Sequence, residues 1–211
     1  IKMKIELINV SKTLNQIEVL KSITTTFESG NVYGLFGRNG SGKTMLLRCI
    51  SGLIAPTVGE VIVDGLNLAE SHSFLPDAGI LLEEPKLLPY LSGLDNLELL
   101  ASINKKIDRE EIKKWLVQFD LDPTDKRKTK KYSQGMRQKI GIIQAMMENQ
   151  QVILLDEPFN ALDVQSSGVL IEVIHSLRDQ NKTIIVTSHE MDYLTAVCDI
   201  ILRMEDGRII N

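Results

Sequence analysis

Eight consecutive residues, Gly37 to Thr44, read GRNGSGKT and fit the pattern G-x-x-x-x-G-K-[ST] of a phosphate-binding loop. Glycines let backbone N–H groups turn toward an anion, and the start of the following helix adds a partial positive charge. Lys43 would reach the β- and γ-phosphates of a nucleotide, and Thr44 would offer its hydroxyl to Mg²⁺. The remaining expected phosphate-binding positions are Gly37, Asn39, Gly40, Ser41 and Gly42.

The flanking segments decide between this chemistry and a flexible glycine turn that binds nothing. An apolar run over 32–36 predicts a buried strand before the loop, and the pattern over 45–50 predicts a helix after it. Strand, glycine loop and helix is the context that the motif requires. The sequence therefore favours a phosphate site.

A pair of carboxylates follows a second buried strand. Residues 152–155 are continuously aliphatic, and Asp156 and Glu157 come directly after them. The carboxyl ends of parallel strands form the ligand-binding edge of such a sheet. Asp156 is predicted to hold Mg²⁺, directly or through water, and Glu157 to act as general base toward an attacking water. The alternative, a strand that merely ends in acidic turn residues, is disfavoured by the phosphate loop upstream.

The elements that must position these residues alternate along the chain. Strands are predicted over 4–10, 18–27, 32–36, 59–64, 77–82, 152–155, 183–187, 200–204 and 208–210, and helices over 45–50, 133–147, 165–180 and 191–197, with helical periodicity also over 92–120. Strands that alternate with helices imply an α/β fold with a mostly parallel sheet. Asp108 is the expected N-cap of a helix inside the 92–120 block.

Bulk properties exclude several classes of protein. The 211 residues carry a net charge of −4, which argues against a primary role in nucleic-acid binding. No apolar run approaches the roughly 20 residues that span a bilayer. The first five residues lead into a strand pattern rather than a secretory leader, so we expect a soluble cytosolic chain. Cys49 and Cys198 both lie in apolar stretches, which predicts two buried, reduced thiols.

The order of motifs resembles a known family over essentially the whole chain. Between the phosphate loop and the carboxylate pair stands Ser133-Gln134-Gly135-Met136-Arg137-Gln138, and after the pair come Asn160-Ala161-Leu162-Asp163 and a lone histidine, His189. These segments resemble the signature motif, the D-loop and the switch histidine of the nucleotide-binding subunits of ABC transporters. The first has the Ser-x-Gly-Met-(Lys/Arg)-Gln form common among bacterial export-type subunits. Taken alone, Ser133 would be only a helix cap and His189 a structural histidine.

The resemblance implies a fold and a set of domains. The fold would be a P-loop NTPase core with a mostly parallel sheet, an N-terminal antiparallel β subdomain and an inserted α-helical subdomain. Residues 1–211 would form one nucleotide-binding domain, with 1–82 and about 150–211 as catalytic core and about 83–149 as helical subdomain.

The resemblance also implies a mechanism and partners. Two subunits would dimerise head to tail around two Mg-ATP, and Ser133 and Gly135 of one would face the γ-phosphate held by the other. Asp163 would connect the two sites, and His189 would contact the γ-phosphate. Hydrolysis would drive a separate integral membrane permease, in the export direction, with the subunit held at the cytoplasmic face of the membrane. A second copy of this chain is the expected dimer partner, and no nucleic acid is expected.

Two positions depart from the family pattern. Where the family carries a Mg²⁺-binding glutamine, this chain has Glu83, whose carboxylate could keep the metal role while changing the local charge. Where the family stacks an aromatic ring on adenine, this chain has Leu14, which could cover a base only by apolar contact. Leu14 therefore predicts weak base discrimination, with GTP accepted nearly as well as ATP.

Two further segments have a structural and a functional interpretation. The basic residues of 126–131 are better explained as a solvated connector than as a site for RNA or anionic lipid. The apolar, proline-punctuated segment 85–91 favours an exposed groove for the permease over core packing.

Two other functions stay open at this point. One is a soluble ABC-type ATPase that acts as an assembly or scaffold factor, as in iron–sulfur cluster maturation. The other is a P-loop kinase or a nucleotide-dependent switch without turnover. The kinase or switch leaves Ser133, Asp163 and His189 without a role.

Overall fold

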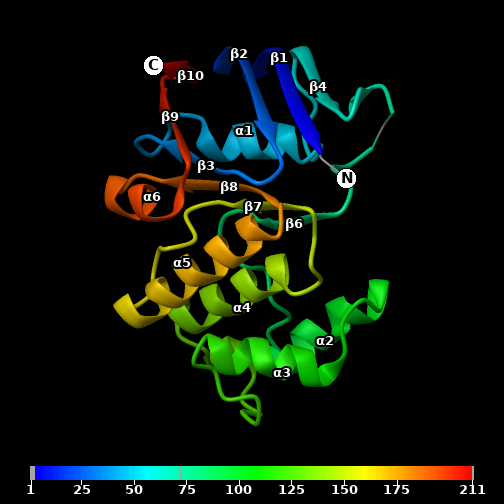
Figure 1. Ribbon diagram of the computed structural model, residues 1–211, viewed down its shortest axis with the longest axis vertical. Coiled ribbons are helices and arrows are strands. Elements are labelled where there is room, and N and C mark those ends of the chain that lie inside the picture. Colours follow the sequence, from blue (N-terminus) through cyan, green and yellow to red (C-terminus); the bar gives the residue numbers. More distant parts are fainter. Residues whose placement is uncertain (1–2, 72, 211) are drawn as a thin grey trace.

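The computed structural model describes residues 3–71 and 73–210 and contains two β-sheets with helices between and below them (Figure 1). One sheet has four strands in the order β2-β1-β4-β5, and the other has six in the order β10-β9-β3-β8-β7-β6. This is the predicted fold class, an α/β core with a mostly parallel sheet beside an antiparallel one.

The antiparallel sheet is built on the β1–β2 hairpin. It consists of β1 (Lys4–Leu14), β2 (Ile17–Glu28), β4 (Val58–Val63) and β5 (Leu66–Asn67). β1 is longer than predicted because a register shift between Leu7 and Val10, where Asn9 has φ 51°, interrupts the apolar alternation without ending the strand. The two-residue strand β5 was not predicted.

The parallel sheet brings distant segments to one edge. β3 (Val32–Phe36), β8 (Thr183–Ser188), β7 (Val152–Leu155) and β6 (Ala78–Leu81) run parallel, and β9 (Ile200–Glu205) is parallel to β3. β10 (Arg208–Ile210) closes the predicted hairpin with β9. The carboxyl ends of β3, β7 and β8 therefore lie side by side, where α/β sheets bind ligands.

Helices cover the two faces of the parallel sheet. α1 (Lys43–Ile50) lies between the two sheets, and α5 (Val164–Asp179) and α6 (Met191–Val197) cover the other face (Figure 1). Neighbouring side chains of β7 enter separate cores, because Leu154 packs with α1 whereas Ile153 and Leu155 pack with the lower helices. β7 is therefore buried on both faces, as its continuous aliphatic sequence predicts.

Three helices form the block between β6 and β7. They are α2 (Gly93–Asn104), α3 (Arg109–Gln118) and α4 (Gln134–Met146), with a short 3₁₀ turn, η1 (Thr129–Lys131), before α4. Asp108 caps α3 as predicted and forms a capping box with Glu111. The charged side chains of 126–131 are exposed, in agreement with a solvated connector.

The two cysteines differ in exposure. Cys49 is buried as predicted, whereas Cys198 is only half-buried because α6 ends just before it. Both thiols are free. Burial raises the pKa of Cys49 to about 11 and that of Cys198 to about 12, so neither is a reactive thiol at neutral pH.

Candidate nucleotide-binding site

The phosphate loop connects β3 to α1 in a conformation that needs glycine. Gly42 is the N-cap of α1 with φ 105°, a value that side chains with a Cβ rarely adopt. At Gly37 a Cβ would come within 2.4 Å of the Met204 carbonyl oxygen, so the loop and β9 are in close backbone approach. Gly40, Asn39, Ser41 and Gly42 belong to this same turn, as the motif predicts.

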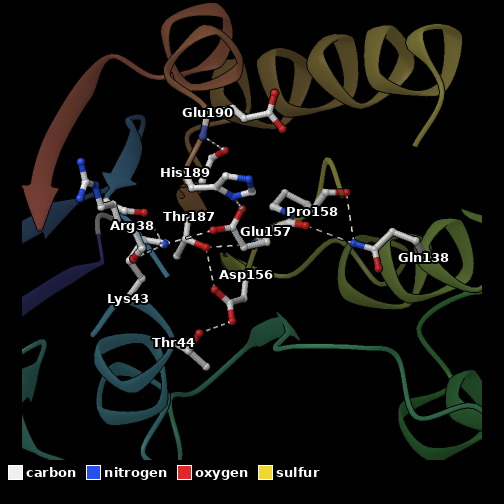
Figure 2. Close-up of polar contacts among 12 residues, drawn as sticks. Arg38, Lys43, Thr44, Gln138, Asp156, Glu157, Pro158, Thr187, His189 and Glu190 are labelled. Atoms are coloured by element: carbon white, nitrogen blue, oxygen red, sulfur yellow. Dashed lines mark hydrogen bonds and ion pairs between the residues drawn. The ribbon is translucent and has the colours of Figure 1, made fainter. Parts of the chain in front are cut away.

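Lys43 crosses the loop from the first turn of α1. Its side chain is almost fully buried, and Nζ donates hydrogen bonds to the carbonyl oxygens of Gly37 (2.6 Å) and Arg38 (3.3 Å). Nζ also lies 3.1 Å from Oε1 of Glu157 (Figure 2). The predicted phosphate-binding cation is therefore tied both to its own loop and to the carboxylate pair.

Asp156 is held by two hydroxyl groups. Thr44 Oγ1 donates a hydrogen bond to Oδ2 and Thr187 Oγ1 donates one to Oδ1, both at 2.6 Å (Figure 2). Asp156 is buried, and its backbone N–H donates to the Leu81 carbonyl of β6. The structure thus brings two of the predicted Mg²⁺ ligands, Thr44 and Asp156, together although 112 residues separate them.

Thr187 has a role that sequence reasoning missed. Its Oγ1 donates to Asp156 and also accepts a hydrogen bond from the Glu157 backbone N–H at 2.9 Å. One hydroxyl therefore fixes both carboxylate residues. The available signal was a hydroxyl residue at the end of a buried strand, two positions before His189.

Glu157 lies between a cation and an imidazole. His189 Nδ1 is 2.9 Å from Oε2, and Lys43 Nζ is 3.1 Å from Oε1 (Figure 2). The Glu157 backbone has φ 48°, a left-handed conformation that is uncommon for a residue with a side chain. Two neighbouring strand ends and the phosphate loop thus converge on the predicted general base.

The signature segment meets the carboxylate pair through Gln138. Its Nε2 donates to the carbonyl oxygens of Pro158 (3.2 Å) and Glu157 (3.4 Å), so α4 grips the chain just after β7 (Figure 2). Sequence reasoning placed Gln138 in the signature motif but gave it no role. A buried amide on an otherwise apolar helix face was the signal.

Ser133, Gly135 and Asp163 form a second group at the helix starts. Ser133 caps α4 by accepting from Met136 N–H, and Asp163 caps α5 by accepting from Ser166 N–H. The hydrogen bond from the Ser166 backbone holds the pKa of Asp163 below its usual value. At Gly135 a Cβ would stand 2.7 Å from the Ala161 carbonyl, so the signature turn lies against the D-loop backbone. Over 3–71 and 73–210, no hydrogen bond or ion pair joins these three residues to the phosphate loop.

Glu83 lies beside the phosphate loop. A cavity of about 400 Å³ is lined by Glu83 together with Thr44, Arg48 and Glu157. The Glu83 carboxylate forms an ion pair with Arg48 of α1 at 2.5 Å, and its backbone has φ 60°. Glu83 therefore contacts the helix that follows the phosphate loop.

Leu14 lies at the tip of the β1–β2 hairpin, where it pairs with Ile17. Both side chains are exposed. Leu14 does not line the cavity that contains Glu83, although Val19 of the same hairpin does.

The segment 85–91 is less exposed than predicted. Leu87 packs against the lower core, and Leu88 is half-buried with its backbone bonded to the Asn96 side chain. Tyr90 is the exposed large side chain of this segment. Packing against the helical block explains Leu87, whereas Leu88 and Leu91 are half-buried and belong to neither core. The docking role of this segment therefore stays a prediction.

The residues of the phosphate loop and the carboxylate pair fit a nucleoside triphosphate and Mg²⁺. Thr44 and Asp156 supply hard oxygen ligands of the kind that Mg²⁺ prefers. The buried Ser41 Oγ in the loop has no hydrogen-bond partner, and Glu157 Oε1 is close to Lys43 without hydrogen-bond alignment. Both are buried polar atoms that lack a hydrogen-bond partner within the described part of the chain, as atoms that bind a ligand often do.

Together, a parallel sheet with a phosphate loop after β3 and a carboxylate pair after β7 defines a P-loop nucleoside triphosphatase. A family model described as "ABC transporter" matches residues 20–160. The chain is also 39% identical over 205 residues to the uncharacterized ABC transporter ATP-binding protein YybJ of Bacillus subtilis (strain 168), with 97% of this chain and 94% of that protein covered. The chain belongs to the family of ABC transporter ATP-binding proteins.

Further relatives and solved structures agree. The bacitracin transport ATP-binding protein BcrA of Enterococcus faecalis is 31% identical over 98% of this chain and 68% of its own length. The dimeric structure of the bacterial ABC transporter cassette MJ0796 matches with a TM-score of 0.86 at 26% identity, over 98% of this chain and 97% of that one. A dimer of the same cassette in a post-hydrolysis state, bound to ADP and Pi, matches with a TM-score of 0.84 at 25% identity, covering 98% and 97%. The chain is thus the ATP-hydrolysing subunit of an ABC transporter. Within the described ranges, none of its helices combines the length and apolarity that crossing a membrane requires.

Proposed function

We propose that this subunit hydrolyses Mg-ATP with Glu157 as general base, and one observation carries the assignment. The Glu157 carboxylate is held between Lys43 and His189, directly after the Asp156 that Thr44 and Thr187 hold. A candidate base must be near a cation that binds the phosphates and near a group that orients it. This arrangement supplies both.

Each side chain of the site has a task that follows from its contacts. Thr44 and Asp156 would hold Mg²⁺, with Glu83 at the rim, and the ion when bound supplies positive charge to the triphosphate oxygens. Lys43 exchanges its carbonyl and carboxylate partners for phosphate oxygens. Glu157, released from Lys43, accepts a proton from the attacking water. His189 orients the Glu157 carboxylate through Oε2 and contacts the γ-phosphate.

The site is completed by a second copy of the chain arranged head to tail. Ser133 and Gly135 stand at the N-terminal end of α4, and Asp163 stands at that of α5, yet none of them bonds to the phosphate loop of its own chain. The start of α4 offers N–H groups and a positive dipole end to the charge that develops on a γ-phosphate. The dimeric state of the similar cassette supports this proposal.

The partner of this dimer is an integral membrane permease on a separate chain, which holds the subunit at the cytoplasmic face. The names of relatives that transport bacitracin and lantibiotics support this proposal, and with the export-type form of the signature segment they favour export. The same names argue against the alternative function, a soluble ABC-type ATPase that acts as an assembly or scaffold factor. Within the subunit, 1–82 and about 150–211 form the catalytic core, and about 83–149 form the helical subdomain.

Glu157→Gln tests the proposal. The amide keeps the shape of the side chain but cannot take a proton, so ATP turnover falls by about 10²-fold or more while ATP still binds. Trapped ATP then holds two subunits together, and size-exclusion chromatography in excess Mg-ATP shows a dimer. Glu190→Gln, which removes a neighbouring exposed carboxylate, is the matched control and keeps turnover. A monomeric Glu157→Gln protein under these conditions would contradict the shared site.

A further inference from the structure

A large cavity lies away from the nucleotide site, between the helical block and the core. Its volume is about 650 Å³, within the range of small-molecule sites. α3 and α5 form its two walls, and residues at the end of α4 and just after it close the cavity. None of the residues that line it belongs to the phosphate loop, the carboxylate pair or the signature segment.

The walls are polar faces of two helices. α3 contributes Glu111, Trp115 and Gln118, which are spaced by four and three residues and therefore lie on one face. α5 and its C-cap contribute an exposed row at intervals of four residues: Glu172, Ser176 and the cap Gln180. The two helices face each other across the cavity with hydrogen-bonding and anionic groups.

The floor of the cavity is apolar and buried. It is formed by Met146 and Met147 at the end of α4 and by Val173 and Leu177 of α5. Trp115 is half-buried and stacks on Phe119 with ring centroids 6.4 Å apart, which fixes the indole at the wall. An apolar floor beside a fixed aromatic ring suits a ligand with a hydrocarbon body.

Glu148 gives the cavity a buried carboxylate with one oxygen that lacks a hydrogen-bond donor within residues 3–71 and 73–210. The residue is 7% exposed and lines the cavity. Asn104 Nδ2 donates to its Oε2 at 2.8 Å, whereas its Oε1 has no hydrogen-bond partner among the described residues. A buried carboxylate oxygen without a donor is costly, so a donor with positive charge would be stabilised there.

The charges around the cavity are not balanced. Three carboxylates line it, those of Glu111, Glu148 and Glu172, against the single ammonium of Lys106. Lys106 Nζ is bound to Asp77 at 2.7 Å, outside the cavity lining. Glu172 takes part in no ion pair in the part of the chain that the structure describes. The lining therefore keeps a net negative charge.

We propose that this cavity binds a small organic cation, a primary ammonium group attached to an apolar or aromatic body. The ammonium group satisfies Glu148, its charge is balanced by Glu111 and Glu172, and its body packs on Trp115 and the methionines. A metal ion fits less well, because no group of three or more potential metal ligands occurs in the described ranges. The proposal is independent of the hydrolysis mechanism.

The chain carries its own probe for the experiment. Trp115 is the single tryptophan of the sequence, so fluorescence excited selectively at tryptophan, away from the four tyrosines, reports on this cavity. The probe ligand is phenethylamine, and 2-phenylethanol is its neutral counterpart of nearly equal size. We expect phenethylamine to change the fluorescence saturably with Kd between about 10 μM and 1 mM, and the alcohol to bind at least about tenfold more weakly.

Variants separate the buried carboxylate from general electrostatics. Glu148→Gln is expected to weaken phenethylamine binding about tenfold or more and leave alcohol binding unchanged. Glu110→Gln, on α3 but outside the cavity lining, is the matched control and keeps full affinity. If Glu148→Gln fails to fold, Glu172→Gln at the exposed wall provides the second variant, with an expected loss of about two- to fivefold. Urea unfolding and ATP binding confirm that each variant is native.

Several outcomes would overturn the proposal. Equal affinity for the amine and the alcohol would show that charge does not matter, and unchanged amine affinity in both Glu148→Gln and Glu172→Gln would place binding elsewhere. No saturable response to phenethylamine in the native protein would exclude the ligand class. Binding of a lysine-rich peptide without binding of phenethylamine would assign the cavity to a protein partner instead.

Discussion

Glu157 shows how the site depends on individual side chains. Its carboxylate is shared between Lys43 at 3.1 Å and His189 at 2.9 Å, and its backbone is fixed by Thr187. When a triphosphate takes over Lys43, His189 becomes the remaining side chain that orients the base. The imidazole therefore acts on the chemical step more than on nucleotide affinity.

Removal of the imidazole tests this division of labour. His189→Ala should lower the rate of phosphate release by about 10- to 10²-fold, because general-base catalysis loses its orienting partner, while the Kd for ATP changes less than about threefold. His175→Ala is a matched control, since His175 bonds to the Ala196 carbonyl on the far side of the sheet from α1. Equal loss in binding and in turnover would show that His189 serves affinity.

Leu14 carries a prediction about nucleotide choice. The tip that it forms with Ile17 offers apolar surface but no aromatic ring or side-chain hydrogen bond with which to read a base. GTP should therefore compete with ATP at a Kd within about threefold. Leu14→Tyr should tighten ATP binding by about two- to tenfold through stacking. A strong preference of the native protein for ATP in the competition measurement would refute this prediction.

At the level of elements, the Glu83–Arg48 pair connects the loop after β6 to α1. Both side chains are substantially exposed, at 54% and 33%, so the pair contributes less than about 1 kcal/mol to the free energy of unfolding. Its position beside Thr44 matters more than its strength, because it brings a carboxylate to the rim of the metal site.

Glu83→Gln should leave stability nearly unchanged and raise the Mg²⁺ concentration required for half-maximal ATPase activity severalfold. The reason is that a neutral amide oxygen attracts a hard divalent cation less than a carboxylate does. Glu84→Gln, a change of the adjacent exposed carboxylate, should have no such effect. An unchanged Mg²⁺ requirement would restrict Glu83 to its pair with Arg48.

Features that depend on local sequence could be predicted here, whereas features that depend on contacts between distant elements could not. The phosphate loop, Asp156, Glu157 and the cap Asp108 were predictable, because local spacing and periodicity determine them. The roles of Thr187, Gln138 and Arg48 were missed, because each acts across 19 to 35 residues and a polar residue at a strand end or on a helix does not reveal which distant group it bonds. β1 was predicted too short for a related reason: its continuation depends on β2 across a bulge.

For the whole molecule, the parallel sheet is the structure that unites the site. Its two faces enter two separate cores, one shared with the antiparallel sheet and one with the helical block. The carboxylate pair and His189 stand at the end of strands that are buried on both faces, which gives them a rigid base. Loss of either core would therefore disturb the same catalytic edge.

The two cysteines predict how the stability of the whole chain depends on alkaline pH. Burial raises the pKa of Cys49 from 9.0 to about 11 and that of Cys198 to about 12. Between pH 9 and 11 the unfolded chain releases thiol protons that the folded chain keeps, so the unfolded state binds fewer protons and stability falls as pH rises. The stabilisation is complete below pH 9 and is lost as pH rises toward the folded values.

Lysine and tyrosine side chains also titrate at alkaline pH. The double variant Cys49→Ala/Cys198→Ala separates the thiol contribution to the pH dependence of stability from theirs. Urea unfolding at pH 7.5, 9.5 and 10.5 should show a smaller alkaline decline for the variant than for the native protein, whatever its stability at pH 7.5. The thiols of the native protein should also react slowly with iodoacetamide at pH 8, because both stay protonated. If the free energy of unfolding fell equally with pH in the variant and in the native protein, the thiols would titrate alike in the folded and unfolded states. Burial would then not raise their pKa values.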